Sequence, residues 1–180
     1  MTHFDEIYDI AVDNYGLVTA AQARERGITS VELRRWCKNG WLDHRGHGAY
    51  NIDHWAPTLL DSYAEALALM GEGSYLRGTA VLDMHDLALV DPRSIKVATA
   101  KRVRRKLPSW VAPVPAKEGD RTTHYEGIRS QRVADAIREC RGYVMRDRLL
   151  AAVDDARREG LITKKEYNEL RRELNPAAKS

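Results

Sequence analysis

The sequence has few cysteines, few aromatic residues and no long apolar run. Its 180 residues include two cysteines, Cys37 and Cys140, which lie far apart and outside any Cys-x-x-Cys arrangement. This spacing excludes a disulfide scaffold and a four-thiolate zinc site. No segment approaches the roughly 20 apolar residues of a membrane-spanning helix, and the N-terminus lacks a basic start followed by an apolar stretch. We therefore expect a cytoplasmic protein with no membrane partner.

Charge is nearly balanced over the whole chain but is unevenly distributed along it. Lys and Arg number 29 against 26 Asp and Glu, which leaves a formal charge of +3. The segment from Arg93 to Trp110 contains seven basic and no acidic residues, whereas residues 1–56 contain six basic and eight acidic ones. One short segment therefore carries more than the net charge of the chain. Length and composition are typical of one medium or two small globular domains.

The first 52 residues have the pattern of a winged helix-turn-helix. An apolar stripe predicts a helix over 4–15, and the capping boxes Thr19–Gln22 and Thr29–Glu32 predict two further helices. Strand-like runs at 41–44 and 49–52 flank an Arg-Gly-His-Gly segment whose glycines permit a hairpin loop. Three helices followed by a hairpin indicate a winged domain, which we place at residues 1–55.

The remaining residues, 56–180, predict a second domain with a small sheet and several helices. Apolar spacing and capping signals predict helices over 57–70, 79–87, 130–140, 143–158 and 163–175. Ser130 is expected to cap the third of these. Strand-like runs lie at 94–98, 110–114 and 123–128. The fold class predicted for the whole chain is therefore α+β.

The helix after the turn is the candidate DNA-reading element. Its apolar residues Leu33, Trp36 and Cys37 share one face, so the opposite face presents Ser30, Val31, Arg34, Arg35 and Lys38. In helix-turn-helix proteins this helix enters the major groove. Arg34 or Arg35 could bind a guanine in a bidentate manner, whereas Lys38 and Arg45 suit phosphate. Basic residues on a helix are also typical of a merely solvated face, but the winged arrangement favours DNA here.

The acidic balance of residues 1–56 is unusual for a module that displaces phosphate counterions. Four of the eight acids fall in the first helix, which lies away from DNA in this fold: Asp5, Glu6, Asp9 and Asp13. We expect modest affinity for one copy, and hence a dimer or cooperative binding to inverted or repeated half-sites in double-stranded promoter DNA.

The basic run has two interpretations. It contains Lys101, Arg102, Arg104, Arg105 and Lys106 with no acidic neighbour, which gives the strongest local positive charge in the chain. It is either a second surface for nucleic acid or a partner, or a solvated loop between two strands. The sequence does not separate these alternatives.

Catalytic and metal-binding patterns are weak. Asp83 and Asp86 follow a Gly-Ser pair, as in nucleotidyltransferases, but they are three residues apart on an expected helix rather than two apart on a strand. His44, His47 and His54 with Cys37 could suggest zinc, although a wing tip accounts better for the glycine-flanked histidines. We expect no enzyme, no metal site and no cofactor.

Several stretches together resemble the AbiEi-type antitoxins. In the N-terminal half they are YGLVTAAQARERGIT at 15–29, LRRWCKNGWL at 33–42 and RGHGAY at 45–50. Further stretches at 78–85, 95–106, 128–135 and 155–163 resemble the second domain of that family. Glu32, Asp43 and His44 depart from the arginine-rich pattern of the family's winged domain.

The resemblance implies a type IV toxin–antitoxin system. The antitoxin would repress its own operon through the winged domain and would counter a nucleotidyltransferase toxin without forming a stable complex with it. It also implies roles for specific residues. Ser30, Arg34, Arg35 and Lys38 become the DNA-reading set, Arg45 and His47 become wing contacts, and Lys101, Arg102, Arg104 and Arg105 become a second positive surface. The alternative is a transcriptional regulator or interaction module that neutralises a partner by direct protein binding.

Overall fold

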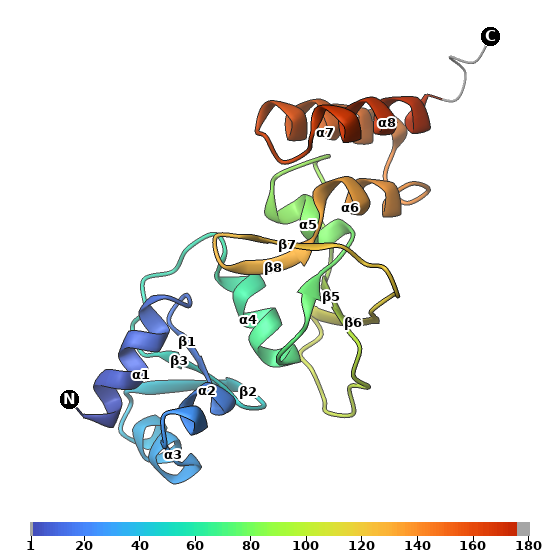
Figure 1. Cartoon of the computed structure of the whole chain (residues 1–180). Coiled ribbons are helices and arrows are strands. Elements are labelled where there is room, and N and C mark those ends of the chain that lie inside the picture. The colour runs from blue at the N-terminus through green and yellow to red at the C-terminus, as the bar shows by residue number, and fades with distance from the viewer. Residues whose placement is uncertain (1, 176–180) are drawn as a thin grey trace. The chain divides into compact units, whose positions relative to one another are not determined.

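The computed structural model describes residues 2–175, which form two compact units (Figure 1). Of the described residues, the first unit, called the winged unit below, comprises 2–74 together with Arg102–Pro108. The second comprises Tyr75–Lys101 together with 109–175. The chain is α+β, as the sequence predicts. We expect a domain boundary at residue 55. Helix α4 (Asp61–Met70), which follows that residue, belongs to the winged unit and packs on its strands.

The winged unit has the element order of a winged helix-turn-helix. Before α4 its elements are α1 (His3–Val12), β1 (Leu17–Thr19), α2 (Ala20–Glu25), α3 (Ser30–Lys38), β2 (Leu42–Gly46) and β3 (Ala49–Ile52). The strands form an antiparallel sheet in the order β1-β3-β2. Helices α2 and α3 are the helix-turn-helix pair, and the β2–β3 hairpin is the wing (Figure 1). The predicted fold of these residues is confirmed.

Local sequence signals explain where the first helices begin. Three capping boxes start α1, α2 and α3, formed by Thr2 with Asp5, Thr19 with Gln22, and Thr29 with Glu32. In each box the threonine hydroxyl accepts a hydrogen bond from the amide three residues later, and each such cap contributes about 1 kcal/mol. Helix α1 ends at Val12, earlier than expected, because Tyr15 already adopts a left-handed φ of 57°.

The core of the winged unit forms where α1 and α3 cover the sheet. Ile7, Val18, Leu33, Trp36 and Leu42 are among its buried side chains. Phe4 adds edge-on contacts to Trp36 and Trp41, with ring centroids 5.4 and 5.0 Å apart. This packing fixes α3 by its apolar face and leaves the opposite face exposed.

We expect Gly16→Ala to destabilise the winged unit by about 2–4 kcal/mol, measured by urea unfolding of the full chain. Gly16 has a φ of +74°, and a Cβ there would lie 2.4 Å from Cγ of Trp55. Gly27→Ala is the matched control, because Gly27 has a φ of +73° but no atom within 4 Å of an added Cβ. It should cost only about 1 kcal/mol from its backbone conformation. Equal losses in the two variants would contradict the steric role of Trp55.

The second unit combines a mixed sheet with four helices in the described residues. Its elements are β4 (Tyr75–Leu76), α5 (Thr79–Met84), β5 (Ile95–Thr99), β6 (Val111–Pro115), β7 (Thr122–Tyr125), β8 (Ile128–Gln131), α6 (Val133–Glu139), α7 (Arg146–Arg158) and α8 (Lys164–Leu174). The strand order is β6-β5-β4-β8-β7, with parallel β5–β6 and β4–β8 pairs. Helix α6 packs against α5, α7 and α8, and α7 and α8 lie side by side (Figure 1).

Two expectations for the second unit are wrong. Ser130 does not cap a helix, since it lies in β8, is fully buried and pairs with Leu76 of β4, and α6 begins three residues later at Val133. The single strand expected over 123–128 is a hairpin of β7 and β8, because Glu126 and Gly127 both adopt positive φ and reverse the chain. The outcome at Ser130 is determined by pairing with a distant strand, whereas the hairpin is determined by a local turn.

The described residues, 2–175, include no helix that is long and apolar enough to span a membrane.

Candidate nucleic-acid interface

Helix α3 presents the predicted DNA-reading residues together on one exposed face. Ser30, Val31, Arg34, Arg35 and Lys38 are all exposed. On the other side Leu33 and Trp36 are buried, at 1% and 3% exposure, and Cys37 is partly buried. The division between a buried and an exposed face is therefore the one that the apolar spacing predicts.

The arginines of α3 are available for a ligand. Arg34 donates its Nε to the carbonyl of Ser30, one turn earlier, at 3.2 Å. Among the described residues, Arg34, Arg35 and Lys38 form no ion pair. These three cations gather on one face of a helix that directly follows a helix-turn-helix turn, which is the arrangement that reads a major groove.

Glu32 is the acidic exception on α3, and its carboxylate is held at the start of the helix. It accepts hydrogen bonds from the amide and hydroxyl of Thr29, and its Oε1 lies 2.7 Å from Nδ1 of His3. These contacts, the Thr29 amide first, lower the pKa of Glu32 to about 2. Its charge therefore caps α3 and links it to α1 instead of neutralising the arginines.

The two other residues predicted to contact DNA lie in the wing, where one is free of ion pairs in the described structure and the other is bonded to α4. His47 is exposed in the loop between β2 and β3. Arg45, in contrast, donates hydrogen bonds from its Nε and Nη2 to the two carboxylate oxygens of Glu65 in α4, at 3.2 and 3.1 Å. The Glu65 side chain is only 12% exposed, and its hydrogen bond raises the pKa of Arg45. A phosphate that binds Arg45 must share it with Glu65.

The basic run divides into exposed and anchored residues. Lys101, Arg102, Arg104 and Lys106 are exposed. Arg105 is half-buried and donates hydrogen bonds to the carbonyls of Leu69 and Met70 at the end of α4. The sequence predicts Arg105 to be one more exposed cation, whereas in the structure it is hydrogen-bonded to α4 within the winged unit.

The structure does not bring the residues of the weak metal and catalytic patterns together into one site. No group of three or more His, Cys, Asp or Glu in the part of the chain that the structure describes could hold a metal ion. His44 packs on the ring of Tyr50, and His54 lies beside Asp53. Asp83 lies in α5, but Asp86 lies beyond the end of that helix with a φ of 52°.

A buried polar cluster in the second unit escaped sequence analysis. Arg77 is 3% exposed and donates to Glu139 at 2.8–3.0 Å and to Asp120 at 2.5 Å. Burial, followed by its hydrogen bond to Asp120, raises the pKa of Tyr75 to about 12, so Tyr75 stays protonated and donates to that carboxylate. The one available signal was that Arg77 is the only basic residue between Pro57 and Pro92.

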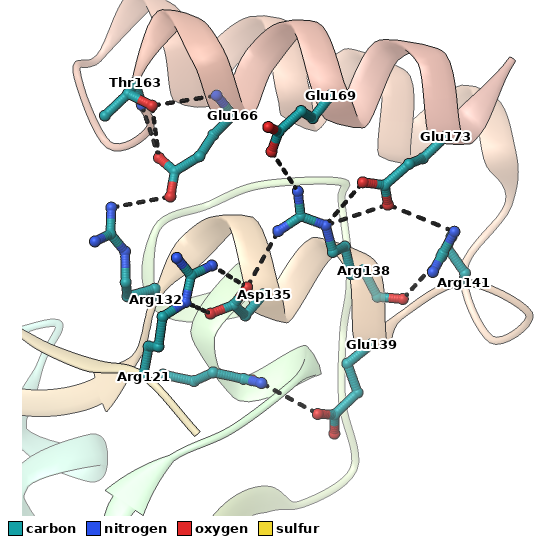
Figure 2. A network of polar contacts seen from close by, with 11 residues as sticks. Arg121, Arg132, Asp135, Arg138, Glu139, Arg141, Thr163, Glu166, Glu169 and Glu173 are labelled. Atoms are coloured by element: carbon teal, nitrogen blue, oxygen red, sulfur yellow. Dashed lines mark hydrogen bonds and ion pairs between the residues drawn. The ribbon is translucent and has the colours of Figure 1, made fainter. Parts of the chain in front are cut away.

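Other cations of the second unit are paired with carboxylates. Figure 2 shows Arg138 of α6 contacting Asp135 and the α8 residues Glu169 and Glu173, at 3.1–3.3 Å. Further ion pairs join Arg121 to Asp135, Arg132 to Glu166 and Arg141 to Glu173. Arg132, Arg138 and Arg141 thus connect α6 and its flanking residues to α8, whereas Arg121 binds α6 itself. All four present less free positive charge than the sequence suggests.

Comparison with known proteins agrees with the winged helix-turn-helix of the first unit. Residues 5–52 match the family model described as "Transcriptional regulator, AbiEi antitoxin". The resemblance to AbiEi antitoxins is thereby confirmed for the winged helix-turn-helix. The AbiEi match runs from within α1 to the end of β3 and includes all seven residues predicted to contact DNA in α3 and the wing. AbiEi antitoxins are regulators, not a family of enzymes. No curated protein matches the chain.

Proposed function

We propose that this protein is the DNA-binding antitoxin of a type IV toxin–antitoxin system, which represses its own operon and counters a nucleotidyltransferase toxin. The observation that carries the proposal is the exposed face of α3, with Arg34, Arg35 and Lys38 free of ion pairs within the described residues. It lies in a winged fold whose residues 5–52 match the AbiEi regulator model.

The proposed roles follow from side-chain chemistry. Arg34 and Arg35 read base edges in the major groove, because a guanidinium fork matches the O6 and N7 acceptors of guanine. Ser30, Val31 and Lys38 line the same groove, with Lys38 on phosphate. Arg45 and His47 contact the backbone from the wing. Since residues 1–56 carry more acids than bases, two or more copies cooperate on inverted or repeated half-sites.

A gel-shift experiment tests the repressor function. The full chain should retard the DNA upstream of its own gene at low salt and at lower concentration than a shuffled duplex of equal length. Specific binding is typically at least about 10³-fold tighter than non-specific binding. Equal retardation of both duplexes, or none, would contradict the proposal.

Growth measurements test the antitoxin function separately. If the neighbouring gene encodes a nucleotidyltransferase, its expression should arrest growth, and co-expression of the full chain should restore it. The proposal places no stable complex between the two proteins, so the antitoxin should not co-purify with the toxin. A stable complex would favour the alternative, an interaction module that acts by direct binding.

A further inference from the structure

The basic segment is built into the winged unit, although it lies in sequence between two strands of the second unit. Residues 102–108 pack with residues 1–74 rather than with β5 and β6, which flank them in the chain. They supply four of the ten Arg and Lys residues of the winged unit, the other six lying within residues 1–74. The segment thus changes the charge of the unit that carries the helix-turn-helix.

Arg105 fastens the segment to the end of α4. Its Nη2 lies 2.6 Å from the carbonyl oxygen of Leu69 and 2.7 Å from that of Met70, and its Nε lies 3.1 Å from the former. The last carbonyls of a helix have no partner within the helix and form the negative end of its dipole. A guanidinium is suited to both features, and the loop between β5 and β6 accordingly reaches the end of α4 (Figure 1).

Helix α4 contacts the wing as well as the basic segment. The Leu69 side chain lies so close to Gly46 of β2 that a Cβ there would be 2.4 Å from Cδ2 of Leu69. One turn earlier, Glu65 holds Arg45 of the wing. A single residue, Leu69, therefore contacts the wing through its side chain and the basic segment through its carbonyl.

The segment alternates between inward and outward side chains. Val103, Arg105 and Leu107 are partly buried, whereas Arg102, Arg104 and Lys106 are exposed. A period of two is that of an extended chain, in which every second side chain points the same way. The three outward cations form no ion pair within residues 2–175, and no acidic residue lies between Arg93 and Trp110.

We propose that Arg102, Arg104 and Lys106 are a second phosphate-binding element of the winged unit, which contacts the backbone of duplex DNA beyond the site that α3 reads. The inference rests on the proposed DNA-binding function. It adds phosphate contacts from a segment that lies outside residues 1–56. Arg105 is its positioning residue and acts through the carbonyls of α4. Flexible cations without aromatic neighbours fit phosphate and not a base, so the element adds affinity without sequence preference.

Salt dependence of DNA binding tests this element in the full chain. The triple variant Arg102→Gln, Arg104→Gln, Lys106→Gln is compared with Lys164→Gln, Lys165→Gln, Arg172→Gln, which removes the same charge from α8. Affinities for the upstream DNA and for a shuffled duplex are measured between 50 and 200 mM salt. Each lost phosphate contact lowers the slope of log affinity against log salt by about 0.9. Over this range the affinity of the triple variant should fall up to about 40-fold less than that of the wild type.

The outcomes are distinct. The triple variant should lose affinity equally on both duplexes, and the α8 control should match the wild type. Arg105→Ala should lower the slope by more than the roughly 0.9 of a single contact, because it releases the other three cations.

An unchanged slope in the triple variant, with binding still sensitive to Arg34 and Arg35, overturns this inference alone. No binding of wild type to either duplex removes the proposed function too. Stronger binding of single-stranded RNA, lost in the same variant, assigns the segment to RNA and overturns the inference.

Discussion

The double variant Arg34→Ala, Arg35→Ala should lose at least about 30-fold in affinity for the DNA upstream of its own gene. Each bidentate contact to a guanine contributes about 1–3 kcal/mol of discrimination, and tenfold in affinity corresponds to about 1.4 kcal/mol. Arg34 makes one hydrogen bond to its own helix, to the Ser30 carbonyl, and both side chains are exposed. Their removal should leave folding stability within about 0.5 kcal/mol of the wild type. Gel-shift titration at fixed salt, with thermal unfolding in parallel, measures the two effects.

A matched variant and a second duplex make the result specific to α3. Lys164→Ala, Lys165→Ala removes two exposed charges from α8 and should bind as the wild type does. On a shuffled duplex the Arg34, Arg35 variant should lose much less than on the upstream DNA, because base contacts confer preference. An equal loss on both duplexes would reassign the two arginines to phosphate, and wild-type affinity would remove them from the interface.

The exposed face of α3 was predictable because its signals are local. A capping box marks its first residue, and the spacing of Leu33 and Trp36 alone decides which side is buried. Nothing outside the helix had to be known. The same holds for the start of α8, where Thr163 and Glu166 form a fourth capping box.

The bonded arginines were not predictable, because their partners lie far away in sequence. Arg45 pairs with Glu65 across 20 positions, Arg105 with Leu69 across 36, and Arg77 with Glu139 across 62. A basic residue in an extended or irregular stretch has the same local pattern whether it faces solvent or a helix end. Ser130 illustrates the same limit, since its strand pairing overrides its local preference for a helix cap.

Arg77→Ala should be the most destabilising single substitution proposed for the second unit, at about 3–5 kcal/mol. The change leaves two carboxylates without their buried cation, since Asp120 and Glu139 are only 14% and 24% exposed. A loss of this size is a large part of the 5–15 kcal/mol that typically separates folded from unfolded protein. Hydrogen exchange of the amides of β4 and β8 in the full chain reports it, because both strands belong to the same unit.

Arg121→Ala is the matched control, because Arg121 also pairs with a carboxylate, that of Asp135, but is half exposed. Exposed pairs contribute about 0–1 kcal/mol, so this variant should exchange almost as the wild type does. Equal effects of the two substitutions would contradict the role of burial.

The Arg77 cluster also predicts a pH dependence. Burial opposes ionisation of Asp120, but hydrogen bonds from Tyr75 and the Lys117 amide, together with the charge of Arg77, lower its pKa overall. A carboxyl whose pKa is lower in the folded state stabilises that state above the unfolded pKa of about 4 and loses this contribution as the pH falls further. Between pH 6 and pH 3 the wild type should therefore lose more stability than Asp120→Asn, which cannot titrate. Parallel losses would show that Asp120 is not the titrating group.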